Sequence, residues 1–167
     1  GKNFRGMMGI PRELTLVKTE KGYLLRQKLV QELEEQKVKK LEAVLDSKSD
    51  KCVDYTQKEP AAVEIVVKLE EDKDMVVDLY GTKCLYHEGV LKIEGIAQRT
   101  EGVAGAAREF TDKEEIKEGQ TYRELKMNTI GKPEKLSLLS DGEILEVTVN
   151  DGLLSEAYET VLDVRKG

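Results

Sequence analysis

The sequence predicts an all-β protein, an antiparallel β-sandwich made of two packed sheets. From about residue 60 onward, apolar and polar residues alternate with a period of two, as in strands that bury one face. The alternating runs are short, and turn sequences that contain Gly separate them. Polar residues at every second position favour antiparallel sheets with one solvated face over the parallel sheet of an α/β fold.

Three runs show the alternation most clearly, and each pairs an apolar face with a polar one. The apolar positions are Val63, Ile65, Val67 and Leu69, then Leu91 and Ile93, then Leu145, Val147 and Val149. The polar positions between them include Glu64, Lys68, Glu70, Lys92, Glu94, Glu146, Thr148 and Asn150. We expect the apolar set to form the core. Glu146 then points away from it, towards a structural or interdomain salt bridge.

Four turn sequences place Gly where a positive φ is favoured, at residues 20–22, 87–89, 140–142 and 150–152. The last of them, Asn150-Asp151-Gly152, lies between Val147-Thr148-Val149 and Leu153-Leu154. This arrangement predicts a hairpin with a tight turn.

Residues 29–45 depart from the strand pattern, because their apolar residues recur at spacings of three and four. Taken alone, this spacing predicts an amphipathic helix, yet residues 38–45 also suit a strand, since tertiary context overrides propensity. We expect a short helical turn near residues 30–36 and leave helix and strand open for 38–45. Residues 46–60 are polar and are expected to form a loop that ends at Pro60.

The composition excludes several classes of partner. The net charge of −6 comes from interspersed acidic and basic residues, so a nucleic-acid partner has little electrostatic support. No apolar run approaches the roughly 20 residues of a membrane span. Cys52 and Cys84 are expected to be free thiols, with a single disulfide as the alternative, and one His with no CxxC pair predicts no metal site. The chain begins at Gly1, so we expect its native N-terminus to be missing and leave the compartment unknown.

Candidate catalytic groups are few. The acidic clusters at residues 70–72 and 114–115 are expected to be solvated turns. His87 stands at a turn with no nucleophile placed beside it. The Gly-rich stretch 101–108 lacks the ending of a phosphate loop and predicts a bend or bulge. For Tyr23, Tyr80, Tyr86, Tyr122 and Tyr158 we expect core packing. The sequence therefore offers no catalytic residue, cofactor-binding residue or metal ligand, and no cofactor.

Two segments resemble glycoside hydrolase family thirty-two, the β-fructosidases. Residues 4–16, with Pro11-Arg12-Glu13-Leu14, resemble the segment that closes the catalytic propeller of these enzymes, and residues 22–27 and 29–33 continue the match. Residues 135–152 are similar to the family's hairpin in its sandwich domain. Thr148 stands where the family usually has an aromatic residue, and Gly142 where Arg is common.

The resemblance implies the end of a propeller and a linker in residues 1–34, followed by a concanavalin-like or lectin-like sandwich in residues 35–167. Retaining fructosidases use two carboxylates held about 5–5.5 Å apart. The family's Asn-Asp-Pro-Asn, Glu-Cys and Arg-Asp-Pro motifs are all absent here. The chain alone is therefore expected not to cleave sugars.

The implied role is to support the propeller, which would be the main partner, and carbohydrate binding to fructan or sucrose is the alternative. Residues 1–30 are expected to pair within that propeller. Without it, Met7, Met8, Ile10, Leu14 and Leu16 would fold back on the sandwich or join a second copy in a homodimer.

Overall fold

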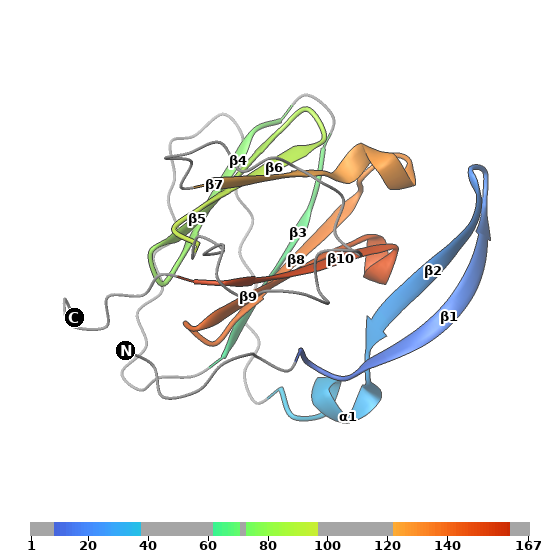
Figure 1. Ribbon diagram of the computed structural model, residues 1–167, viewed down its shortest axis with the longest axis horizontal. Coiled ribbons are helices and arrows are strands. Elements are labelled where there is room, and N and C mark those ends of the chain that lie inside the picture. The colour runs from blue at the N-terminus through green and yellow to red at the C-terminus, as the bar shows by residue number, and fades with distance from the viewer. Residues whose placement is uncertain (1–8, 38–61, 71–72, 97–121, 161–167) are drawn as a thin grey trace, which may run out of the picture.

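The computed structural model describes residues 9–37, 62–70, 73–96 and 122–160, and the statements below concern these described residues. They form three antiparallel sheets, two of which pack face to face as a sandwich (Figure 1). The third is a two-stranded hairpin at the N-terminal end, which projects from one side of the sandwich. The all-β sandwich predicted from the alternating pattern is confirmed.

The described elements follow one another as short strands with three single helical turns. They are β1 (Arg12–Thr19), β2 (Gly22–Leu29), α1 (Gln31–Glu34), β3 (Val63–Lys68), β4 (Met75–Leu79), β5 (Thr82–His87), β6 (Val90–Glu94), β7 (Tyr122–Lys126), the 3₁₀ turn η2 (Met127–Ile130), β8 (Lys135–Ser140), β9 (Ile144–Val149), the 3₁₀ turn η3 (Asn150–Gly152) and β10 (Leu154–Glu159).

The sandwich consists of two four-stranded sheets. The first, called the β9 sheet, has the order β10-β9-β8-β3, and the second, called the β5 sheet, has the order β4-β5-β6-β7. Short turns join β4 to β5, β5 to β6, β8 to β9 and β9 to β10, whereas β6 pairs with β7, and β3 with β8, across longer separations in the chain. An isolated bridge between Ile96 and Thr160 links the chain just after β6 to the end of β10.

The core lies between the two sheets and is built from the alternating apolar positions. Leu91 and Ile93 contribute from β6, and Leu145, Val147 and Val149 from β9, and all five side chains are fully buried. Val63, Ile65 and Leu69 pack against this cluster from the β3 side. Burying a side chain of this size contributes about 1.5–3 kcal/mol, so the period-two pattern accounts for the packing of the two layers.

The predicted turn glycines all adopt positive φ, from +80° at Gly89 to +108° at Gly22. The turn between β5 and β6 is a two-residue loop in which Glu88 (φ +44°) also adopts positive φ. This is the turn geometry that suits the right-handed twist of a hairpin. The predicted hairpin at Asn150-Asp151-Gly152 is confirmed as the connection between β9 and β10.

The expected helical turn near residues 30–36 is confirmed as α1. The alternatives for residues 38–45, the loop at 46–60 and the Gly-rich stretch 101–108 lie outside the described residues. Cys84 is a free, buried thiol as expected, while Cys52 lies outside the described part of the chain.

The expectation of core packing holds for only some of the tyrosines. Tyr86 is buried in the core and Tyr158 packs against it. Tyr122 is half-buried, with the ammonium group of Lys92 4.3 Å from its ring centroid. The expectation is wrong for Tyr23 and Tyr80, which are 65 % and 38 % exposed. Tyr23 lies on the projecting hairpin and Tyr80 at a turn, so neither faces the space between the sheets.

Candidate functional site

The most elaborate group of polar contacts joins the N-terminal hairpin to the sandwich, and it begins at Glu146. This residue lies on the outer face of β9 and is only 3 % exposed. One carboxylate oxygen accepts a hydrogen bond from the backbone N–H of Ile10 at 2.9 Å, and the other forms an ion pair with the guanidinium of Arg12. The salt bridge predicted for Glu146 is confirmed. Its partner was not predicted.

Arg12 also makes contacts on both sides of the joint, the region where the N-terminal hairpin meets the outer face of the β9 sheet. Its Nη1 donates to the carbonyl oxygen of Gln27 on β2 at 3.1 Å and to the hydroxyl of Thr148 at 3.3 Å. Arg12 therefore ties its own hairpin together while it binds two residues of β9. Thr148 stands where the family that this sequence resembles usually has an aromatic residue. Here its hydroxyl oxygen accepts a hydrogen bond from the guanidinium of Arg12.

A backbone contact lies beside the ion pair. Gly152, with a φ of +100°, sits so close to β2 that a Cβ atom placed on it would lie 2.4 Å from the carbonyl oxygen of Gln27. Only Gly fits such an approach. The turn between β9 and β10 is thus pressed against β2 near the base of the hairpin.

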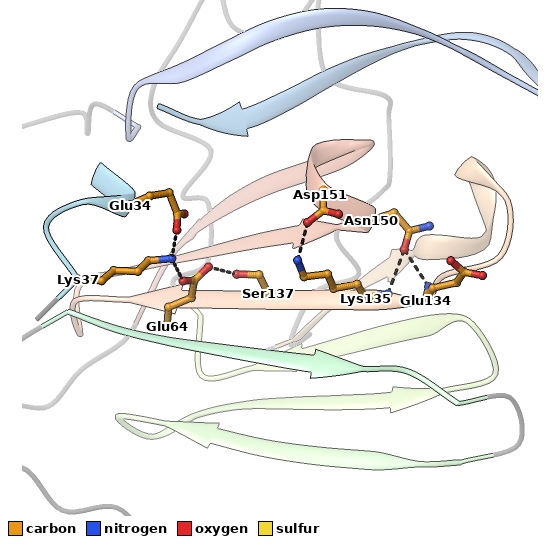
Figure 2. A network of polar contacts seen from close by, with 8 residues as sticks. All are labelled: Glu34, Lys37, Glu64, Glu134, Lys135, Ser137, Asn150 and Asp151. Atoms are coloured by element: carbon orange, nitrogen blue, oxygen red, sulfur yellow. Dashed lines mark hydrogen bonds and ion pairs between the residues drawn. The ribbon is translucent and has the colours of Figure 1, made fainter. Parts of the chain in front are cut away.

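A second polar anchor holds the chain after the hairpin, as Figure 2 shows. The ammonium group of Lys37 pairs with Glu34 at 2.6 Å and with Glu64 on β3, and the hydroxyl of Ser137 on β8 donates to Glu64 at 2.6 Å. Partial burial lowers the pKa of Lys37, but the hydrogen bonds to the two carboxylates outweigh it and the pKa is raised. The N-terminal segment is therefore fastened to the outer face of the β9 sheet before and after the hairpin.

The tip of the hairpin makes one more contact with the sandwich. The ammonium group of Lys21 donates to the backbone carbonyl oxygens of Asn128 at 3.1 Å and Thr129 at 3.4 Å, both in η2. The sandwich therefore contacts the hairpin near its base and at its tip, and polar or backbone groups make the contacts described at both ends.

Four apolar side chains on one face of the hairpin are turned to solvent, whereas Val17, Leu24 and Leu29 are half-buried. Leu14, Leu16, Tyr23 and Leu25 are between 49 % and 66 % exposed. Leu16 pairs directly with Leu25, and Lys18 with Tyr23, so the alternation of the two strands places all four on one face. The expectation that Leu14 and Leu16 fold back on the sandwich is wrong, because Arg12 and the backbone of Gln27 make that contact instead. Met7 and Met8 lie outside the described residues.

The turn that contacts β2 is itself held by a side-chain network, also drawn in Figure 2. The Oδ1 atom of Asn150 accepts from the backbone N–H groups of Glu134 at 2.8 Å and Lys135 at 3.1 Å. Its Nδ2, outside the contacts drawn, donates to the carbonyl oxygen of Lys132 at 2.8 Å. Lys135 also pairs with Asp151 at 2.6 Å. These contacts fix η3 against the start of β8 and so set the position of Gly152.

The remaining candidates from the sequence lie apart from this joint. His87 is exposed and its Nδ1 lies 2.7 Å from a carboxylate oxygen of Asp74. This hydrogen bond and the charge of Asp74 raise the pKa of His87. Burial, together with the charge of Asp78, raises the pKa of the Cys84 thiol to about 12, so the thiol is a poor nucleophile.

Of the two acidic clusters, only Glu70 falls in the described part. It is exposed and pairs with Lys73 at 3.6 Å, in line with the expected solvated turn. Among the described residues, no group of three His, Cys, Asp or Glu side chains is arranged to hold a metal ion. The described helices also include none with the length and apolar character of a membrane span.

An open cavity of about 280 Å³ lies at the joint, lined in part by Ile10, Arg12, Gln27, Glu146, Ser155 and Glu156. None of its lining residues is aromatic, so the cavity offers no flat ring on which a sugar could stack. Arg12 and Glu146 neutralise each other at its wall. The cavity thus lies where the hairpin meets the β9 sheet, and burial raises the pKa of Glu156 at its wall.

Sequence reasoning missed Arg12, Gln27, Lys37 and Glu64 as members of the joint. A signal for Arg12 was present, because it stands in one of the two segments that resemble the β-fructosidases. Nothing in the sequence pointed from it to Glu146. Comparisons of this chain with models of protein families, with curated proteins and with solved structures find no match.

Proposed function

We propose that this chain is the non-catalytic β-sandwich region of a β-fructosidase-type glycoside hydrolase and supports a catalytic propeller that carries the reacting carboxylates. One observation supports this most directly. The two segments that resemble the family, near Arg12 and near Glu146, are in contact through a buried ion pair. If both segments recur in the family because they hold the end of the propeller against the sandwich, they are expected to contact each other, as Arg12 and Glu146 do here.

The exposed face of the hairpin supports the same role. A two-stranded hairpin is marginally stable by itself in water. This one is held by the sandwich and turns Leu14, Leu16, Tyr23 and Leu25 outward. Contiguous exposed apolar side chains of this kind mark interaction sites. In the proposed enzyme, the propeller covers them.

Two measurements test the proposal. The purified chain is incubated with sucrose and with levan, and released fructose is measured; we expect none. The coding sequence upstream of Gly1 is then read for an Asn-Asp-Pro-Asn motif in the same frame, which we expect to find several hundred codons earlier, roughly the size of a large single domain. Fructose release by the isolated chain, or an upstream frame that encodes no such module, contradicts the proposal.

Carbohydrate binding without cleavage is the second candidate, and the exposure of Tyr23 favours it, because a solvent-facing ring is what sugar platforms present. Titration calorimetry with sucrose and levan separates the two candidates. A supporting domain gives no heat of binding. A binding module gives weak binding that is lost in Tyr23→Ala and kept in Tyr86→Phe, where the ring stays in the core.

A further inference from the structure

We propose that the outer edge of β1, together with the apolar face of the hairpin, is a strand-addition site for an edge strand that places apolar residues beside Leu14 and Leu16 and an acidic residue beside Lys18. The inference rests on the proposed function, since it specifies the surface through which the sandwich joins its catalytic module. It adds which edge of the hairpin pairs and which chemistry the pairing strand carries.

The two edges of the hairpin differ in what covers them. The outer edge of β2 meets η3, where Gly152 packs against the backbone of Gln27. Within the described part of the chain, β1 pairs with β2 and with no other strand. A new strand would therefore meet η3 at the β2 edge, whereas no described strand occupies the β1 edge.

The register shows which backbone groups this open edge offers. Beyond the base of the hairpin, the N–H of Val30 donates to the carbonyl oxygen of Pro11 at 3.4 Å, so this opposing pair is hydrogen-bonded. Bonded and non-bonded pairs alternate in an antiparallel ladder. The N–H and C=O groups of Leu14, Leu16 and Lys18 therefore point away from β2. Such a row of unpaired groups is the template for strand addition.

The side chains along this edge set the pattern of the added strand. Leu14 and Leu16 are 61 % and 66 % exposed on the same face, and Leu25 and Tyr23 continue that face across β2. A strand that pairs with β1 places every second side chain beside them. The positions of the added strand that lie beside Leu14 and Leu16 are therefore expected to be apolar.

The positive charge of the hairpin narrows the choice of the added strand. Residues 12–29 contain five basic and two acidic side chains, and because Glu146 neutralises Arg12 they keep a net charge of +2, although the whole chain has a net charge of −6. Lys18 lies on the apolar face, and no ion-pair partner is described for it. Opposite charges at facing positions stabilise a strand pair and like charges destabilise it. An acidic residue beside Lys18 is favoured, and the hairpin of a second copy, which carries the same net positive charge, is disfavoured as the occupant.

Two synthetic peptides test this on the full chain. Both peptides alternate threonine with the residues that lie on the face of Leu14, Leu16 and Lys18; on that face one peptide carries two valines and a glutamate, and the other two valines and a lysine. Each is titrated at millimolar concentration while backbone amide shifts and amide exchange are followed by NMR. We expect the glutamate peptide to shift and protect the amides of Leu14, Leu16 and Lys18. The amides of β2 should change less, the binding should weaken with added salt, and the lysine peptide should have no effect.

A pair of variants isolates the role of the backbone edge. Lys18→Pro removes an outward N–H together with the charge, and Lys18→Ala removes the charge alone. We expect Lys18→Pro to weaken binding several-fold more than Lys18→Ala. Amide protection at Val17 and Leu24, whose N–H groups point into the hairpin, reports that β1 and β2 are still paired in both variants.

Binding of the lysine peptide as strongly as the glutamate peptide, protection confined to β2, or no response to either peptide overturns the inference. So does a sedimentation coefficient that rises with protein concentration and falls when Leu16 is replaced by Lys, because a second copy then occupies the edge. These outcomes leave the proposed function standing. Fructose release by the chain ends the proposed function but leaves the peptide result unchanged.

Discussion

Glu146 and Arg12 are 134 positions apart in the chain, and their side chains form a buried ion pair where the hairpin meets the sandwich. The carboxylate also accepts the N–H of Ile10, so both of its oxygens are bonded. The hairpin thus depends on β9 for its attachment, although its own strands are local in sequence.

Replacing Glu146 by Ala is expected to destabilise the protein by about 3 kcal/mol, because removing one member of a buried pair leaves the other charge without a partner. Arg12 retains some solvent contact, being 13 % exposed, which places the value at the lower end of the usual range. Urea unfolding measures it. Glu13→Ala, on the exposed neighbour of Arg12, is the control and should change stability little. Equal losses in the two variants contradict the role given to Glu146.

Hydrogen exchange on the Glu146→Ala variant shows which strands lose stability. In Glu146→Ala we expect the amides of β1 and β2 to exchange faster while those of β8 and β5 stay protected. The reason is that the sandwich core contains neither Arg12 nor Ile10. A uniform increase over the whole chain would mean that the ion pair supports the sandwich rather than the joint.

Gly152→Ala is expected to cost clearly more than Gly131→Ala. Both glycines adopt positive φ, +100° and +111°, so both substitutions introduce backbone strain. Only the Cβ at Gly152 meets backbone atoms, while nothing lies within 4 Å of a Cβ at Gly131. The added clash is of the order of 1–3 kcal/mol. Thermal unfolding of the two variants side by side measures the difference, and matching values would refute the close approach to β2.

Asn150→Ala removes three hydrogen bonds to the backbone and is expected to destabilise by about 2 kcal/mol, since a typical bond contributes roughly 0.5–1.5 kcal/mol and these are partly exposed. Asn150→Asp keeps the acceptor oxygen and loses only the donor to Lys132, so its loss should be smaller. Denaturant midpoints rank the two. An Asp variant as unstable as the Ala variant argues against the acceptor role of Oδ1.

The pKa of His87, followed by NMR, is expected to lie above its ordinary value of 6.5, because Asp74 stabilises the charged ring. A raised pKa in the folded state means that the pair stabilises the fold at low pH and that this contribution is lost as pH rises through the raised value. Asp74→Asn should bring the pKa back towards 6.5. An unchanged pKa in that variant excludes Asp74 as the cause.

Much of the fold follows from local pattern. Leu145, Val147 and Val149 are buried because a strand turns every second side chain to the same face, and that rule needs no knowledge of the partner strand. The turn glycines follow for a similar reason, since positive φ is a property of one residue and its neighbours. The tyrosines show the limit of such reasoning: Tyr23 and Tyr86 both lie in strands, yet only Tyr86 faces a second sheet.

The sequence by itself determined that Glu146 would point away from the core, since its alternation with Leu145 and Val147 decides the face. Only the tertiary structure decided that this carboxylate meets Arg12 and that Gly152 presses on Gln27. The physical reason is one of range. Alternation and turn preference act between neighbours in the chain, whereas an ion pair or a backbone contact depends on distances that exist only after β9, β10 and the hairpin have packed together.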